Sequence, residues 1–108
     1  MLFRSLWAWG YGGGGNLGLA SSGSVSSPNQ VGSLTTWSKI AASNYNDAGF
    51  GIQTNGSLWS WGVGTYGLLG LNDITSKNSP NQIGGSLVGY TSLSATSQSV
   101  FGVRTDNT

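Results

Sequence analysis

The chain has 108 residues, of which only 6% are charged, and its formal net charge is +1. Four cations and three carboxylates cannot form the clustered basic face that holds nucleic acid or an anionic membrane surface, so neither partner is expected. The chain has no cysteine and no histidine. Disulfides, thiolate chemistry and a Ser-His-Asp or Cys-His catalytic site within one chain are therefore excluded, and zinc would lack its usual ligands.

Composition favours an all-β fold. The 19 glycines exceed the average share more than twofold, but five Trp, four Tyr and three Phe argue against a disordered chain. Aromatic residues, β-branched residues and turn formers in this mixture are typical of short strands joined by tight turns. No window carries the roughly 18 apolar residues of a membrane-spanning helix, so no membrane span is expected.

The most informative feature of the sequence is a long internal repeat. Residues 6–10 read Leu-Trp-Ala-Trp-Gly and return at 58–62 as Leu-Trp-Ser-Trp-Gly, 52 residues further on. Two more segments recur at nearly the same spacing: 27–31 at 79–83, and 50–54 at 101–105. A period of this length indicates a repeat architecture, in which each unit buries its apolar face against a neighbour.

Each repeat predicts the same elements in chain order: a Trp-rich strand, a glycine-rich turn, a polar loop closed by a proline, a short edge segment and two further strands. In the first repeat they are residues 6–9, 10–18, 20–27 with Pro28, 29–31, 37–42 and 48–54. In the second repeat they are residues 58–61, 62–70, 72–79 with Pro80, 81–83, 90–95 and 100–105. The dipeptide Asn55-Gly56 predicts a hairpin turn leading into the second Trp-rich strand.

The expected architecture is therefore all-β, with two four-stranded antiparallel blades of a β-propeller-type repeat. Residues 1–5 are a lead-in, 6–57 the first repeat or blade, and 58–108 the second. A third repeat would begin just after residue 108, so we expect either the edge of a longer array or an end that meets another chain. Two units are fewer than the roughly three that such repeats need for stability, which favours a partner.

Several short motifs follow one another in the same order in both repeats. In the first repeat they are residues 9–10, 15–18, 28–31, 37–40 and 55–56; in the second they are 61–62, 67–70, 80–83 and 90–93. This order resembles the repeat of the regulator-of-chromosome-condensation family. That repeat reads approximately Leu-Trp-x-Trp-Gly, x-Asn-x-x-Gly-Gln-Leu-Gly, Pro-x-Gln-Val, Trp-x-x-Ile and Asp-Gly. The resemblance covers nearly the whole chain and implies a propeller of about seven four-stranded blades.

The chain departs from the family pattern at several positions. Gly12 and Gly64 stand where the family usually has Asn, and Asn16 and Leu68 stand where it has Gln. Residues 43–47 replace a common Gly and His. The best-known member of the family is an exchange factor for a small GTPase and binds chromatin through parts outside the repeat, none of which this chain matches. Similar repeats occur in bacterial and phage surface proteins, and the charge-poor texture of this chain resembles those.

The tryptophans predict packing between blades. Trp7 and Trp9 lie two residues apart and share one face of a strand, as do Trp59 and Trp61. Such faces also serve as sugar-stacking platforms, but they are more often core. The expected inter-blade or assembly contacts are Trp7, Trp9, Trp37, Trp59, Trp61 and Tyr90. The candidates for exposed ligand contacts, which lie in polar loops, are Tyr11, Tyr45 and Tyr66.

The remaining motifs suggest no chemistry. Residues 10–15 and 62–67 match Gly-x-Gly-x-x-Gly, but without the helix and acidic residue of a dinucleotide site, so we interpret them as turns. The side-chain carboxylates are Asp47, Asp73 and Asp106, and the last two occupy ordinary turn positions. The sequence therefore predicts no catalytic, cofactor-binding or metal-binding residue, no cofactor and no enzyme activity.

The first hypothesis for function is a non-enzymatic structural or interaction protein of an extracellular or virion surface, such as a component of a phage tail or fibre. Its expected partners are other copies of itself or further repeats of a longer chain, joined head to tail because the terminal blade faces are apolar. The alternative is a carbohydrate-binding adhesion module that takes a surface glycan. GTPase exchange on chromatin is a third, less favoured hypothesis, because basic clusters are lacking.

Overall fold

The computed structural model describes residues 3–43, 47–85 and 88–105, which form short antiparallel strands joined by turns. The strands are β1 (Trp7–Gly10), β2 (Val25–Gln30), β3 (Trp37–Ser43), β4 (Ala48–Gln53), β5 (Leu58–Gly62), β6 (Lys77–Ile83), β7 (Tyr90–Ala95) and β8 (Val100–Arg104). Two single-turn 3-10 helices, η1 (Gly13–Gly15) and η2 (Thr65–Gly67), follow β1 and β5. The predicted all-β antiparallel fold is confirmed.

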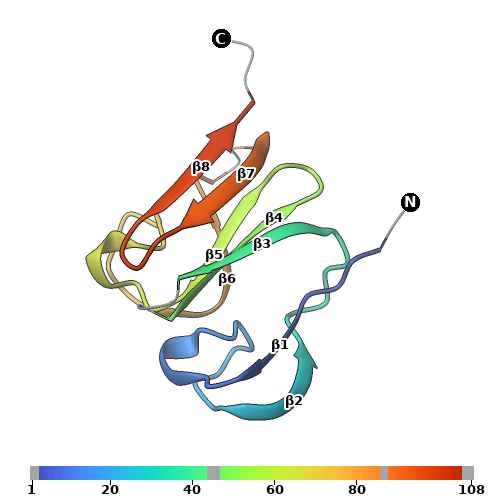
Figure 1. Ribbon diagram of the computed structural model, residues 1–108, viewed down its shortest axis with the longest axis vertical. Coiled ribbons are helices and arrows are strands. Elements are labelled where there is room, and N and C mark those ends of the chain that lie inside the picture. Colours follow the sequence, from blue (N-terminus) through green and yellow to red (C-terminus); the bar gives the residue numbers. More distant parts are fainter. Residues whose placement is uncertain (1–2, 44–46, 86–87, 106–108) are drawn as a thin grey trace.

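The eight strands form three sheets, with two, four and two strands. Their orders are β1-β2, β3-β4-β5-β6 and β7-β8, and Figure 1 shows the four-stranded sheet lying between the other two. The central sheet therefore takes two strands from each repeat, so the sheets do not coincide with the expected blades 6–57 and 58–108. The reason is the Asn55-Gly56 turn, where the Gln53 N–H donates to the Ser57 carbonyl over 2.9 Å and ties β4 to β5.

Equivalent strands of the two repeats pair in the same register. Trp7 faces Gln30 just as Trp59 faces Gln82, and both pairs of strands carry an irregularity two residues further on. The pairs β3-β4 and β7-β8 likewise share one register and an irregularity near their start. The sequence repeat is therefore a repeat of three-dimensional structure, and the paired strand residues of one copy have structural equivalents in the other.

Two prolines lie inside strands and not at the ends of loops as expected. Pro28 is part of β2 and Pro80 is part of β6, so these strands begin several residues earlier than the predicted segments 29–31 and 81–83. Both strands lie at the edge of a sheet. A proline has no N–H to donate to a neighbouring strand. On an edge strand this costs no hydrogen bond where the backbone nitrogen faces away from the sheet.

The glycine-rich segments form the turns predicted for them. At equivalent points the Gly12 and Gly64 N–H groups donate to Ser24 Oγ and Ser76 Oγ, over 3.1 and 3.3 Å. The backbone passes so close here that a Cβ on Gly64 would lie 2.1 Å from the Thr75 carbonyl oxygen. Only glycine, which has no Cβ, allows the two backbone segments to come this close. This explains why both turns carry a glycine at this position.

The core lies on both faces of the central sheet. On one face Phe50 is fully buried with Leu68 and Leu69, and side chains of β7 and β8 pack against this cluster. The opposite face carries Trp61, whose ring lies beside η1 and the sheet β1-β2. The central sheet therefore holds the two outer sheets in place by different aromatic side chains on its two faces.

Candidate functional site

Three of the predicted packing residues form one aromatic cluster on the central sheet. The Trp37 ring lies edge-on to Trp59 and Trp61, with ring centroids 6.5 and 5.9 Å apart. Glycines of β4 leave room for it: a Cβ on Gly51 would lie 2.5 Å from the Trp37 ring, and one on Gly49 would lie 2.4 Å from Trp61 Nε1. These described ring contacts of Trp37 are within its own sheet.

Trp61 joins the central sheet to the sheet β1-β2. Its Nε1–H donates to the Asn16 carbonyl over 3.0 Å, and the side chain is only 5% exposed. A Cβ on Gly18 would lie 3.1 Å from the same ring. The structure thus places Trp61 at a contact between the central sheet and the sheet β1-β2.

The equivalent residue of the first repeat has no such surroundings. Trp9 is 59% exposed and its neighbour Trp7 is also exposed, although both have the same register on β1 as Trp61 and Trp59 have on β5. The local conformation is nevertheless the same, since Trp7 Nε1–H donates to Ser5 Oγ (2.8 Å) as Trp59 Nε1–H donates to Ser57 Oγ (2.9 Å). Within the described residues, β1 pairs only with β2, whereas β5 pairs with two strands.

The other end of the molecule has a matching open edge. Among the described residues β8 pairs only with β7, although its equivalent β4 pairs with both β3 and β5. Phe101 on β8 is 65% exposed and Val103 is exposed beside it, whereas the equivalent Phe50 has no exposed surface. Tyr90 is half-buried and packs in its own sheet, its ring 3.4 Å from the place of a Cβ on Gly102.

The sequence analysis does not single out Phe101. The sequence of its strand is similar to that of β4. Periodicity indicates which residues share a face of a strand, but it does not indicate whether a neighbouring strand covers that face. The only available signal is the repeat alignment itself, in which Phe101 is the equivalent of Phe50.

Of the three tyrosines expected to be exposed, two are described and both are exposed. Tyr11 lies beside η1, where its ring covers Gly13, and Tyr66 lies in η2 with a left-handed φ of 64°. Tyr45 lies outside the described residues. The two described rings sit at equivalent glycine-rich turns without forming a common site.

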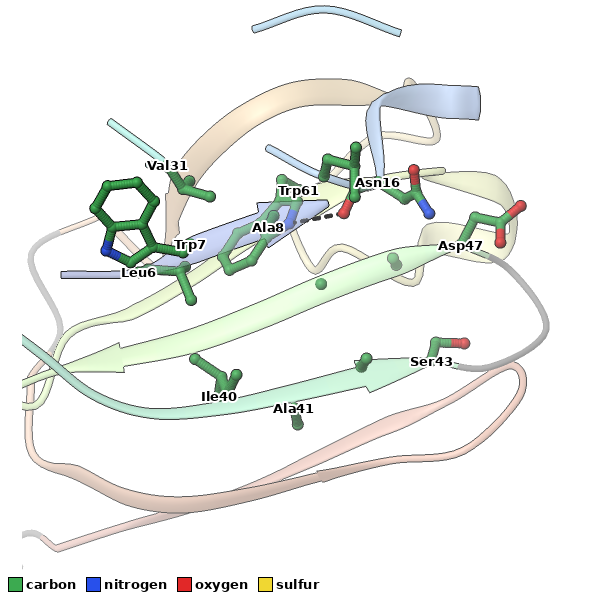
Figure 2. Close-up of a pocket in the computed structure, with 14 residues that line it drawn as sticks. Leu6, Trp7, Ala8, Asn16, Val31, Ile40, Ala41, Ser43, Asp47 and Trp61 are labelled. Atoms are coloured by element: carbon green, nitrogen blue, oxygen red, sulfur yellow. Dashed lines mark hydrogen bonds between the residues drawn. The ribbon is translucent and has the colours of Figure 1, made fainter. Parts of the chain in front are cut away.

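An apolar cavity of about 500 Å³ lies between the sheet β1-β2 and the central sheet. Figure 2 shows Leu6, Trp7 and Val31 on one side and Ile40 of β3 on the other, with Asp47 and Ser43 toward one end. Ile40 is exposed although it lies in the middle of β3.

Another pocket, of about 290 Å³, lies beside the Asn55-Gly56 turn, and most of the residues that line it are polar. It is lined by Trp59, Gln53 and Gln82, among others. Gln53 is only 5% exposed; its Oε1 accepts a hydrogen bond from Thr36 Oγ1, while its Nε2 has no partner in the described structure. A buried amide donor of this kind is costly to leave unpaired, so the pocket suits a polar ligand or water.

Two of the three carboxylates, Asp47 and Asp73, lie within the described residues. Asp73 accepts hydrogen bonds from the Thr75 hydroxyl and N–H, which lower its pKa, and the cation of Lys77 at 3.5 Å lowers that pKa further. Asp47 lines the apolar cavity, and Asp106 lies outside the described residues. Across the described ranges no three His, Cys, Asp or Glu side chains gather where a metal ion could bind. Nor does that part of the chain contain a helix long and apolar enough to cross a membrane.

Antiparallel sheets that repeat in one register and pack against one another agree with a β-propeller repeat protein. The sequence model of the regulator of chromosome condensation (RCC1) repeat matches residues 5–46 and 55–98. The chain belongs to this family of RCC1 repeat proteins.

A solved structure supports the same fold. The chain is similar to human WBSCR16 as seen in its crystal structure, with a TM-score of 0.77 and 18% sequence identity. The match covers 94% of this chain and 27% of that chain, so our chain spans about a quarter of its length. A comparison with the curated proteins finds no match.

Proposed function

We propose that this chain is a non-enzymatic structural protein that contributes blades to a larger propeller-type assembly on an extracellular or virion surface. One observation carries the proposal: the same aromatic residues are buried in the middle of the molecule and exposed at its two ends. Trp61 is 5% exposed and its equivalent Trp9 59%; Phe50 is 0% exposed and its equivalent Phe101 65%. Exposed apolar patches of this kind mark contact surfaces.

The open edges support the same proposal. In the described structure β1 and β8 each present one row of backbone N–H and C=O groups without a neighbouring strand. Free strand edges of this kind pair readily with another strand. The scarcity of charge on a chain rich in Ser, Thr, Asn and Gly supports a surface location, as in the bacterial and phage surface proteins that it resembles.

Sedimentation velocity and native mass spectrometry of the purified chain, over about 1 to 100 µM, test for assembly. We expect species larger than one chain whose share rises with concentration. A single species of 11.1 kDa over the whole range would contradict the proposal. Immunogold labelling of intact virions or cells that produce the protein tests its location, and label seen only after lysis would contradict a surface role.

A second candidate function is binding of a surface glycan. The polar pocket beside the Asn55-Gly56 turn favours it, because an aromatic ring and amide side chains are the groups that hold a sugar face and its hydroxyls. Titration with glycans is expected to change the tryptophan fluorescence of the chain and to lose this effect in Gln53→Leu. A flat titration across a glycan array would count against this function without affecting the assembly proposal.

A further inference from the structure

We propose that the two ends of the chain are complementary. Phe101 of one copy fills the cavity between the sheet β1-β2 and the central sheet of the next copy. In return, Trp9 of that next copy fills a second cavity, which lies near β8 of the first copy. The partner is a second copy of this same chain. The inference rests on the proposed structural role and specifies its contact.

Phe50 shows what a Phe at this repeat position does when its strand has a neighbour. It lies in β4 and is buried between the central sheet and the sheet β7-β8. The side chains gathered around it come mainly from the segment that follows η2 and from β6, β7 and β8. They include Leu68, Leu69, Ile83, Leu93, Ala95 and Val100.

The repeat equivalents of these six residues all line the cavity between β1-β2 and the central sheet. They are Asn16, Leu17, Val31, Ile40, Ala42 and Gly49. The equivalence follows from the shared registers, in which Ile40 faces Gly51 as Leu93 faces Gly102. The cavity of about 500 Å³ therefore has the surroundings of a Phe side chain, and no Phe is among the described residues that line it.

The side chain that would fill this cavity is displayed at the other end. Phe101 is the equivalent of Phe50 in the second repeat, and it is exposed on the open edge of β8. Placing β8 beside β1 of the next copy, as β4 lies beside β5, sets Phe101 opposite Ala8 because Phe50 lies opposite Ser60. The half-sheets β7-β8 and β1-β2 then make one four-stranded sheet.

The same pairing accommodates Trp9 of the next copy. Within the chain, Trp61 rests against Asn16, Gly18, Trp37 and Gly49. Their repeat equivalents all line a cavity of about 410 Å³ near β8, and they are Leu68, Gly70, Tyr90 and Val100.

The indole of Trp9 would enter this second cavity, with its Nε1–H directed at the Leu68 carbonyl as Trp61 Nε1–H is at that of Asn16. The two sites differ at one position, because Val100 stands where Gly49 leaves room for Trp61. A Cβ on Gly49 would lie 2.4 Å from Trp61 Nε1, so the Trp9 ring must lie further from β8 than the Trp61 ring lies from β4.

The contact is tested first by removing each inserted side chain. Phe101→Ala and Trp9→Ala should each weaken self-association at least about tenfold in sedimentation velocity, since each leaves an unfilled apolar cavity. The matched control is Phe3→Ala, because Phe3 is 73% exposed and lies outside both cavities. This control should associate as the unaltered chain does. Circular dichroism confirms that each variant keeps its fold.

Mixing the two weakened variants provides a sharper test. A Trp9→Ala chain still has Phe101, and a Phe101→Ala chain still has Trp9, so one intact contact forms between them. The mixture should give a heterodimer that grows no further, which native mass spectrometry identifies by mass.

Cross-linking tests the strand register. The chain has no cysteine, so single substitutions report one contact. Val103 should face Leu6 of the next copy, since Ile52 faces Leu58 in the central sheet. Oxidising a mixture of Val103→Cys and Leu6→Cys chains should give a disulfide-linked pair, because facing residues have the Cα separation that a disulfide needs. Arg104→Cys mixed with Leu6→Cys is the control, one residue out of register and directed to the other face.

The outcomes separate this contact from the broader proposal. If the chain self-associates but Phe101→Ala and Trp9→Ala behave like Phe3→Ala, the contact is overturned and a structural role stands. A cross-link that forms only with Arg104→Cys overturns the register and thereby the contact. A chain that is monomeric throughout overturns both, and further repeats of a longer chain then become the occupant of the cavity.

Discussion

Phe50 and Phe101 occupy equivalent strand positions, but their contributions to stability differ because only Phe50 is covered by neighbouring side chains. Phe50 is completely buried, so Phe50→Ala should lower the free energy of unfolding by about 3–5 kcal/mol through loss of apolar burial and creation of a cavity. Phe101→Ala removes an exposed ring and should change the stability of the single chain by no more than about 0.5 kcal/mol.

Urea unfolding of both variants, at a concentration where the chain is monomeric, checks this pair. Equal losses of stability would mean that Phe101 is buried within one chain and is not available to a partner.

Asp73 offers a second prediction at the scale of one residue. Hydrogen bonds from Thr75 lower the pKa of this carboxyl most, and the charge of Lys77 contributes less. Thr75→Val should therefore raise the Asp73 pKa toward its ordinary value by more than Lys77→Met does. NMR titration of the carboxyl carbon measures both, and a larger shift in Lys77→Met would contradict the order of causes.

The direction of the pH effect follows from the lowered pKa. A carboxyl with a lower pKa in the folded chain stabilises the fold above its unfolded pKa, and this contribution is lost as the pH falls through the folded pKa. Asp73 is fully exposed, so its contribution to stability is small.

Among the structural elements, the glycine-rich turns are the most demanding. A Cβ on Gly64 would lie 2.1 Å from the Thr75 carbonyl oxygen, which is backbone and cannot rotate away. Gly64→Ala should therefore cost at least about 2 kcal/mol of stability, because the turn must open to admit the methyl group. Gly23→Ala is the matched control, since its nearest neighbouring atom is 3.9 Å away and its backbone conformation is open to other residues. Thermal melts that show equal losses for both would contradict this account.

The positions of most strands follow from the sequence. Trp-rich segments, the Asn55-Gly56 hairpin and the paired strands after Trp37 and Tyr90 all lie within a residue or two of their predicted places. The early starts of β2 and β6 do not follow, because Pro28 and Pro80 read as loop ends unless the strand is known to be an edge.

The grouping of strands into sheets also could not be predicted from the sequence. A repeat of 52 residues gives the spacing of the units but leaves open which strands of neighbouring units pair. Short loops decide this: the tight turn between β4 and β5 joins the two repeats in one sheet. Among the candidate site residues, the spacing of the tryptophans indicates which of them share a strand face. The exposure of Trp9, like that of Phe101, depends on whether a neighbouring strand covers it, which periodicity does not report.

At the scale of the whole molecule, the shared central sheet means that neither repeat is an independent folding unit. A peptide of residues 1–54 holds only β1 to β4, and one of residues 55–108 holds β5 to β8, so each keeps half of the central sheet. Isolated two-stranded units are marginal in water, so each peptide alone should be unfolded.

Mixing the two peptides should restore the central sheet and the β signal in far-ultraviolet circular dichroism. A peptide of residues 1–54 that shows a cooperative melt on its own would contradict this expectation.

The boundaries of the sheets do not coincide with the boundaries of the sequence repeats. This has a consequence for genes that gain or lose repeats. Inserting or deleting one whole repeat adds or removes one four-stranded sheet in the interior and leaves β1-β2 and β7-β8 at the ends. Duplication would therefore alter the length of the protein without altering the two ends that we propose to pair. Lineages that differ in repeat number would keep ends that still fit one another, so unequal crossing-over is a source of size variation that leaves compatibility intact.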